Sequence, residues 1–235
     1  MSDPALMVDE IFGPTIQGEG EVVGRYTVFV RLAGCDYKCN WCDSLHAVIK
    51  GHSRPWTRMS AQEVAARVEQ LSPPCLVTIS GGNPLLFDCE LLISLLHDGG
   101  YSVAVETQGS VFKPWLREVD FLTLSPKPPS SGHETDWDVL FQCADAAFGQ
   151  LTIKVVVFGD EDYAYAKEVY EQMRHQARFY DAGFYLSVGT PQVPDVVPDI
   201  MSDFRWLAEK VVSDRWPVAV LPQLHVLAWG AERGR

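Results

Sequence analysis

Three cysteines lie close together in the sequence and have a spacing that suits a metal centre. Cys35, Cys39 and Cys42 form a CxxxCxxC pattern in the segment GCDYKCNWCD, whereas the other three cysteines are scattered. A structural zinc ion is usually held by four ligands, often as two separated pairs. Three neighbouring thiolates without a fourth cysteine instead favour a four-iron four-sulfur cluster. Such a cluster would keep one iron open for a ligand, and an open iron can do chemistry.

Two alternatives to the iron–sulfur interpretation remain at this point. Asp43 or His46 could be the fourth ligand of a zinc ion, or the cysteines could pack in a loop without binding a metal. The chain starts with acidic residues and a proline rather than a basic segment followed by an apolar one. We therefore expect a cytoplasmic protein, in which clustered cysteines indicate metal binding or catalysis rather than disulfides.

Composition excludes several classes of protein. The chain has 235 residues, and 47% of them are hydrophobic, so a disordered chain is excluded. Its 19 basic and 31 acidic residues give 19 − 31 = −12, which argues against a nucleic-acid-binding protein. No run of 18 apolar residues occurs, so we expect no membrane-spanning helix.

The elements that must position the cysteines alternate between strand and helix patterns. We expect apolar strands at residues 26–33, 75–80, 101–106, 119–125, 152–158, 183–188 and 217–221. Helices are expected at residues 60–71, 85–97, 113–118, 136–147, 161–178 and 198–214. Ser60 and Glu63 have the spacing of a capping box at the first of these helices.

This alternation is typical of a parallel sheet covered by helices. About seven strands are one short of an eight-stranded barrel. We therefore predict an α/β fold with one domain over residues 1–235 that forms an incomplete, truncated parallel β/α barrel. A doubly wound open sheet is the alternative. In both architectures ligands bind at the carboxyl ends of the strands. Polar or glycine-rich segments follow six of the expected strands, which places them on one rim.

The cysteine segment resembles the cluster-binding loop of the radical S-adenosylmethionine superfamily. The resemblance implies that the three cysteines each bind one iron and that S-adenosylmethionine chelates the fourth. Reductive cleavage of the cofactor then gives a 5′-deoxyadenosyl radical, which abstracts a hydrogen atom from the substrate. The protein positions the cofactor and the substrate and excludes side reactions.

The chain resembles one family within this superfamily, the 7-carboxy-7-deazaguanine synthases. The motifs that carry the resemblance are EIFGPTIQGEG, VRLAGCDYKCNWCDS, ISGGNP, ETQGS, LSPKPPSSG, KVVVF and LPQLHVLAWG. The resemblance implies the conversion of 6-carboxy-5,6,7,8-tetrahydropterin to 7-carboxy-7-deazaguanine with loss of ammonia, in queuosine and 7-deazapurine biosynthesis. It also implies a Mg²⁺ ion, a homodimer and an electron donor such as flavodoxin or ferredoxin.

Ligand roles follow from the match of each motif with the family. Ser44 matches a hydroxyl that binds Mg²⁺, an ion that prefers oxygen ligands, although it could also cap the following turn. Glu106 could bind ribose hydroxyls, and Lys127 could pair with the carboxylate of the cofactor. The residues expected to contact S-adenosylmethionine are Trp41, Asp43, Gly82, Glu106, Gln108, Ser125, Pro126, Lys127 and Ser187. Asn83 stands where the superfamily often has a glutamate.

Substrate binding is expected from an N-terminal segment at about residues 8–25 and from the rim. Arg31 is a charged residue in an otherwise apolar strand, and its planar guanidinium suits a substrate carboxylate. Gln17 can read the donors and acceptors on the edge of a pterin. The residues expected to contact the substrate are Ile16, Gln17, Gly18, Glu19, Arg31, Ser80, Pro222 and Gln223. For Pro222, Gln223 and His225, pocket lining and a dimer contact are both open.

Two other functions are compatible with the cysteine motif. An activating enzyme that abstracts hydrogen from a glycine of a partner protein would share the short barrel and the CxxxCxxC loop. In that case the segment GPTIQGEG would have no evident purpose. A zinc-stabilised binding protein without catalysis is the alternative from another class.

Overall fold

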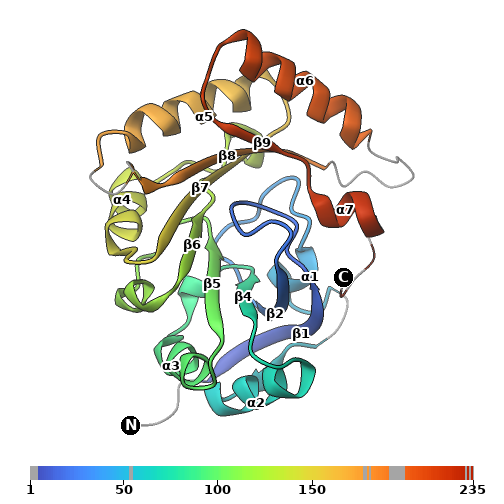
Figure 1. The fold of residues 1–235 in the computed structure, drawn as a ribbon, viewed down its shortest axis with the longest axis vertical. Coiled ribbons are helices and arrows are strands. Elements are labelled where there is room, and N and C mark those ends of the chain that lie inside the picture. Colours follow the sequence, from blue (N-terminus) through green and yellow to red (C-terminus); the bar gives the residue numbers. More distant parts are fainter. Residues whose placement is uncertain are drawn as a thin grey trace.

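The fold is built on one open sheet that curves around the site. The computed structural model describes residues 5–52, 55–176, 179, 181–190, 199–230, 232 and 234. Within these residues, the nine strands of the sheet run in the order β3-β1-β2-β4-β5-β6-β7-β8-β9. Because β3 and β9 lie at opposite ends of this order, the barrel does not close. The open, incomplete barrel expected from the sequence is therefore confirmed (Figure 1).

Seven strands form the parallel part of the sheet, and they agree with the seven that the sequence predicted. They are β2 (Tyr26–Leu32), β4 (Leu76–Gly81), β5 (Ser102–Thr107), β6 (Phe121–Leu124), β7 (Gln150–Val157), β8 (Gly183–Val188) and β9 (Ala219–Leu221). Most of their residues are apolar and buried, as expected for strands covered on both faces. Their carboxyl ends lie on one rim, which collects the polar segments that follow them.

Two antiparallel strands were not predicted. β1 (Leu6–Ile16) pairs with β2, and β3 (Thr57–Met59) pairs with β1. β1 has a mixed polar and apolar sequence that includes Gly13-Pro14, so its pattern did not indicate a strand. The segment 8–25 that we expected to bind substrate is thus a strand as far as Ile16, and only its second part is a loop.

Helices follow most strands on the outer side of the sheet (Figure 1). The α-helices are α1 (Leu45–Val48), α2 (Ala61–Leu71), α3 (Glu90–Asp98), α4 (Trp137–Ala146), α5 (Asp160–Met173), α6 (Ile200–Ser213) and α7 (Leu224–Trp229). Short 3-10 helices are η1 (Pro84–Leu86), η2 (Pro114–Glu118) and η3 (Pro129–Ser131). The capping box of Ser60 and Glu63 at α2 is present, as predicted.

One predicted helix is divided. Residues 85–97 were expected to form one helix, but η1 ends at Leu86 and α3 begins only at Glu90. Asn83 accepts a hydrogen bond from the backbone N–H of Leu85, which starts the short helix directly behind the glycine turn. This local turn separates the site from the helix that packs on the outside.

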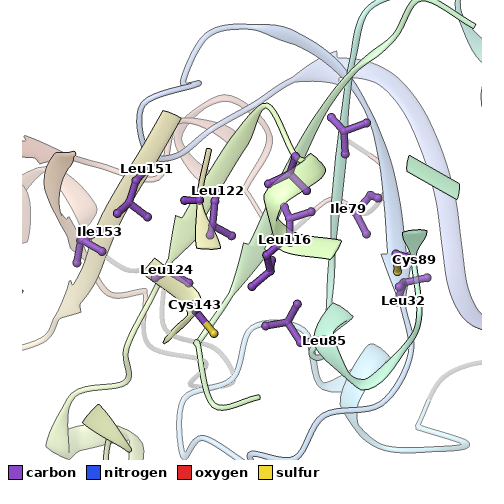
Figure 2. Close-up of a cluster of buried hydrophobic side chains, with 14 of the residues drawn as sticks. Leu32, Ile79, Leu85, Cys89, Leu116, Leu122, Leu124, Cys143, Leu151 and Ile153 are labelled. Carbon is purple, nitrogen blue, oxygen red and sulfur yellow. The ribbon is translucent and has the colours of Figure 1, made fainter. Parts of the chain in front are cut away.

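The core lies between the sheet and the helices. Figure 2 shows Leu32, Ile79, Leu122 and Ile153 from neighbouring strands packed with Leu116. Cys89 and Cys143 are part of this core, as expected for cysteines packed as small hydrophobic residues. Burial of such side chains contributes about 1.5–3 kcal/mol each, so the rim rests on a rigid support. No helix among the described residues is long and apolar enough to cross a membrane.

Candidate active site at the carboxyl ends of the strands

The cysteine loop starts at the end of β2 and is held against the glycine turn that follows β4. The backbone N–H of Gly82 donates to the Leu32 carbonyl at 3.0 Å, and the N–H of Asn83 donates to the Gly34 carbonyl at 2.8 Å. A Cβ atom at Gly82 would lie 2.0 Å from the Gly34 oxygen. Glycine is therefore required here by the backbone of the cysteine loop, a reason that the sequence did not show.

Asp36 joins three loops around the first cysteine. Its carboxylate accepts hydrogen bonds from the side chains of Asn83, Gln108 and Ser110, at 2.8, 2.9 and 2.6 Å. The Gln108 amide also lies 3.5 Å from the Cys35 sulfur. Asn83, which replaces the glutamate of many superfamily members, thus has a structural role beneath the loop.

The other side of the cysteine loop is attached to the segment around η3. The indole N–H of Trp41 donates to the Ser130 hydroxyl at 2.9 Å. The Tyr37 ring stacks on His133 with ring centres 4.1 Å apart, and the backbone N–H of Lys38 donates to the Nε2 atom of His133. Asp162 of α5 accepts hydrogen bonds from both the backbone and the hydroxyl of Ser130. The loop is therefore ordered by protein contacts alone.

The three clustered thiols are half-buried, and their environment suits a cluster better than a single zinc ion. Burial raises the pKa of all three, that of Cys42 to about 11. Thiolates around one tetrahedral zinc would lie about 3.8 Å apart. Among the His, Cys, Asp and Glu side chains of the described residues, only Asp9, Glu10 and His46 bring three ligand atoms within 4.8 Å of one another. At least two of the three clustered sulfurs are therefore more than 4.8 Å apart.

His46 is not placed as a fourth ligand of the cysteine group. It is 9% exposed, and its Nδ1 atom lies 3.0 Å from a carboxylate oxygen of the buried Asp9 on β1. This pair joins α1 to the edge of the sheet. The zinc alternative through His46 therefore has no support in the geometry.

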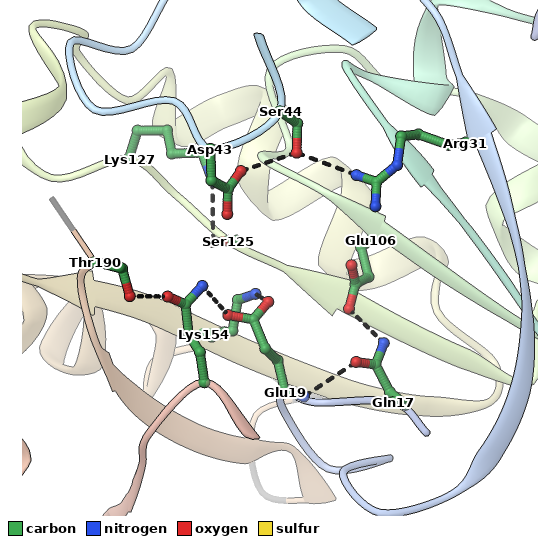
Figure 3. Close-up of polar contacts among 11 residues, drawn as sticks. Gln17, Glu19, Arg31, Asp43, Ser44, Glu106, Ser125, Lys127, Lys154 and Thr190 are labelled. Atoms are coloured by element: carbon green, nitrogen blue, oxygen red, sulfur yellow. Dashed lines mark hydrogen bonds and ion pairs between the residues drawn. The ribbon is translucent and has the colours of Figure 1, made fainter. Parts of the chain in front are cut away.

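Arg31 lies at the end of β2 and links the sheet to the segment after the cysteines. Its Nε atom donates to Glu10 at 3.0 Å, and its guanidinium also donates to the Ser44 hydroxyl at 3.1 Å. Ser44 in turn donates to Asp43 at 2.9 Å (Figure 3). Ser44 makes no capping hydrogen bond to α1, so the role as a cap that we considered is absent. The Ser44 hydroxyl oxygen instead lies beside the Asp43 carboxylate, and Mg²⁺ prefers such oxygen ligands.

The loop after β1 crosses the sheet and reaches β5 and β7. The Gln17 amide donates to Glu106 at 2.8 Å, and the backbone N–H of Glu19 donates to the Gln17 carbonyl oxygen at 3.0 Å. The Glu19 carboxylate binds Lys154 at 2.6 Å and accepts from Gln223 at 3.0 Å. Figure 3 shows these side chains side by side, below Arg31 and Ser44. Glu106 thus lies where the expected cofactor and substrate residues meet.

Two carboxylates in this group have shifted pKa values in opposite directions. Burial, together with the nearby charge of Glu19, raises the pKa of Glu106. Burial alone would also raise the pKa of Glu19, but Lys154 and His225 outweigh it and lower this pKa to about 2. Carboxylates whose pKa values are shifted apart in this way are suited to different roles in proton transfer.

Lys127 follows β6 and lies beside the cysteine loop. Its ammonium donates to the Ser125 hydroxyl at 3.2 Å and lies 6.0 Å from the centre of the Trp41 ring. Burial, and the like charge of Lys154, lower the pKa of Lys127. The cofactor carboxylate that we expect here would supply the missing counter-charge.

Two buried hydroxyls on the strands have no hydrogen-bond partner. They belong to Ser80 at the end of β4 and Ser187 in β8, and both residues were expected to contact ligands. A buried hydroxyl without a partner is costly, so such groups call for an explanation. Together with three half-buried thiols on one loop, they fit a site that is completed by bound cofactor and substrate.

The remaining expected residues lie on the same rim without polar side-chain contacts to the groups above. Pro126 is buried directly after Ser125, Ile16 ends β1, and Pro222 follows β9. Gly18 packs against His225, because a Cβ at position 18 would lie 2.3 Å from the Nδ1 atom of that ring. The Gln223 side chain is 6% exposed and donates to Glu19, so it belongs to the same hydrogen-bonded group as that carboxylate.

Sequence reasoning missed Lys154 and Asp36. Lys154 is the one charged residue in β7, QLTIKVVV, so the argument that singled out Arg31 in its apolar strand applies to it as well. Asp36 stands in a polar loop, where an aspartate carries no comparable signal.

Comparisons with known proteins agree with this geometry. Residues 16–110 match a family described as a 4Fe-4S single cluster domain. The chain is 43% identical to the 7-carboxy-7-deazaguanine synthase of Bacillus cereus, over 97% of this chain and 98% of that one. It is 41% identical to the same enzyme of Bacillus subtilis strain 168, again over 97% and 98%.

Solved structures show the same fold. QueE from Escherichia coli has a TM-score of 0.69 and 24% identity, over 94% of this chain and 95% of that chain. SuiB of Streptococcus suis, bound to S-adenosylmethionine, has a TM-score of 0.52 and 14% identity, over 80% of this chain and 44% of that chain. With near-complete coverage of relatives above 40% identity, the chain belongs to the 7-carboxy-7-deazaguanine synthase family.

Proposed function

We propose that this enzyme converts 6-carboxy-5,6,7,8-tetrahydropterin to 7-carboxy-7-deazaguanine with loss of ammonia, as a step in queuosine and 7-deazapurine biosynthesis. The observation that carries the proposal is the meeting of two groups on one rim. Arg31 and Ser44, which are hydrogen-bonded to each other, lie with Lys127 on the side of the cysteine loop, and the loop of Gln17 and Glu19 lies opposite. A radical generated at the first group would reach a substrate held by the second.

Cys35, Cys39 and Cys42 would hold the four-iron four-sulfur cluster. When bound, the cluster and S-adenosylmethionine supply the 5′-deoxyadenosyl radical. The residues that would hold S-adenosylmethionine are Trp41, Asp43, Gly82, Glu106, Gln108, Ser125, Pro126, Lys127 and Ser187. Among them, the Lys127 ammonium suits the cofactor carboxylate because it is buried beside the loop.

The substrate would lie between Arg31 and Glu19. The guanidinium of Arg31 would attract the substrate carboxylate, and Ser44 would hold a Mg²⁺ ion that the same carboxylate completes. The ring would be read by Gln17, Glu19 and backbone groups of Ile16 and Gly18, with Ser80, Pro222 and Gln223 completing the wall. Proton transfers during loss of ammonia can use Glu19 and Glu106, because their pKa values differ.

Three further parts of the proposal rest on the family resemblance. They are a homodimer, flavodoxin or ferredoxin as the electron donor, and a cytoplasmic location. The two alternative functions lose support. An activating enzyme would not need the loop of Gln17 and Glu19, and the wide spacing of the sulfurs does not suit a zinc ion.

The test is anaerobic turnover by the reconstituted enzyme with reductant, S-adenosylmethionine, Mg²⁺ and the tetrahydropterin. The expected result is 7-carboxy-7-deazaguanine, detected by mass spectrometry, without net consumption of S-adenosylmethionine. Cys42→Ala should lose iron and turnover, whereas the control Cys143→Ala, which changes a core cysteine, should bind about four irons per chain. Cleavage of S-adenosylmethionine without the deazaguanine product would refute the proposed substrate.

A further inference from the structure

Lys154 is a buried cation that the sequence did not single out and that has no role in the reaction described above. It stands in the middle of β7 beside Glu19, and 8% of its side chain is exposed (Figure 3). Its ammonium lies 2.6 Å from one carboxylate oxygen of Glu19, while Gln223 donates to the other oxygen at 3.0 Å. Both oxygens of this carboxylate therefore have fixed partners.

The contacts continue from Glu19 to the opposite side of the pocket. The backbone N–H of Glu19 donates to the side-chain oxygen Oε1 of Gln17, and this orients the side-chain NH₂ group of Gln17 toward Glu106. Thr190 contacts Gln223 on the far side. A chain of hydrogen bonds thus runs from the segment after β8 through Glu19 to β5, and among the described residues Lys154 is the one cation bonded to it.

We propose that Lys154 is a positioning residue: it holds the loop of Gln17 and Glu19 across the open sheet and keeps Glu19 an ionised acceptor at the substrate end of the pocket. The carboxylates of Glu106 and Asp43, the cations Lys127 and Arg31, and the imidazole of His225 are the other charged or titratable groups that face the pair of Lys154 and Glu19. A single buried cation between two carboxylates separates their protonation states.

Removal of the Lys154 charge should raise the pKa of the neighbouring carboxylates. Burial is the largest influence on Glu19 and raises its pKa, and Lys154 is the largest opposing one. Without the ammonium, Glu19 and Glu106 would be buried near each other as like charges, so one of them would take up a proton at a higher pH than in wild type. The ionised acceptor would then be lost as the pH falls, and the loop would lose its anchor on β7.

The inference rests on the proposed substrate site, and its test is a binding experiment. The dissociation constant of the tetrahydropterin is measured with the cluster-loaded enzyme without reductant, from about pH 6 to about pH 9. Lys154→Met is compared with wild type, with Lys154→Arg, and with Lys167→Met. The last is a matched control, because Lys167 pairs with Asp214 on the outer helices and is 44% exposed.

We expect Lys154→Met to weaken substrate binding at least tenfold at about pH 6 and less at about pH 9. The ratio of its dissociation constant to that of wild type should change with pH as the titration of a single group does. Lys154→Arg should bind the substrate within a few-fold of wild type, and the pH dependence seen in Lys154→Met should be absent. Binding of S-adenosylmethionine should change less than twofold, which shows that the fold and the cluster loop are intact. In a Glu19→Gln background, Lys154→Met should cause little further loss, because the two act as one unit.

Three results would overturn the inference. They are unchanged substrate binding in Lys154→Met, a loss of equal size at every pH, or an equal loss of S-adenosylmethionine binding. A wild-type enzyme that does not bind the tetrahydropterin would instead refute the proposed substrate, so the two failures are distinguishable.

Discussion

Replacement of Ser80 by alanine should make the protein more stable and a weaker binder of its substrate. The Ser80 hydroxyl is buried at the end of β4 without a hydrogen-bond partner. An unsatisfied buried hydroxyl costs about 1–3 kcal/mol, so its removal should raise the free energy of unfolding by about 1 kcal/mol. In a chain of this size, 1 kcal/mol corresponds to about 2–4 °C in Tm. Loss of one hydrogen bond to the substrate should weaken binding about five- to tenfold.

Ser72 provides the matched control for this prediction. It is buried to a similar degree, but its hydroxyl donates to the Pro73 carbonyl at 2.8 Å, and its oxygen lies 3.2 Å from the Tyr26 hydroxyl, which can donate to it. Ser72→Ala should therefore lower the free energy of unfolding by about 1 kcal/mol and leave substrate binding unchanged. The two variants should differ in Tm by about 4–8 °C, in opposite directions from wild type.

The assay for both variants combines thermal unfolding of the cluster-loaded enzyme without ligands and isothermal titration with the tetrahydropterin. The reasoning fails if Ser80→Ala lowers Tm as much as Ser72→Ala, since the Ser80 hydroxyl would then have a partner within the protein. It also fails if substrate binding is unaffected, because the hydroxyl would then not be reserved for the ligand.

Three other predictions concern the charged groups of the site. Arg31→Met should weaken substrate binding at least tenfold, which is about the loss of a charge-assisted hydrogen bond, and S-adenosylmethionine binding less than twofold. Equal losses in the two titrations would reject the role of Arg31 in binding the substrate carboxylate. Ser44→Ala should abolish the stimulation of turnover by Mg²⁺, and an unchanged Mg²⁺ dependence of the rate would count against this ligand. Because folding lowers the pKa of Glu19 from 4.5 to about 2, its carboxylate stabilises the fold fully above about pH 4.5, and this contribution is lost as the pH falls toward 2. In Glu19→Gln, the decline of the free energy of unfolding between about pH 5 and pH 3 should therefore be shallower, by at most about 2 kcal/mol, and a decline as steep as in wild type would contradict the lowered pKa.

The parallel strands and the cysteine motif could be predicted because each depends on neighbouring residues. Short apolar runs such as VAV in β5 and VVV in β7 predict buried strands, and the structure contains them. β1 escaped prediction because its polar residues and Gly13-Pro14 interrupt any simple pattern, and its pairing with β2 rather than its own sequence makes it a strand.

The sequence by itself determined the chemistry that the chain can host: the spacing of Cys35, Cys39 and Cys42 in one loop, and the order of strands that carries polar residues to one rim. Only the tertiary structure decided which polar groups meet. Gln17 meets Glu106 across 89 positions, and Glu19 meets Lys154 across 135 and Gln223 across 204. Such contacts have no local signal, because charge pairing and burial depend on distance in space, and that distance is set by the curvature of the sheet.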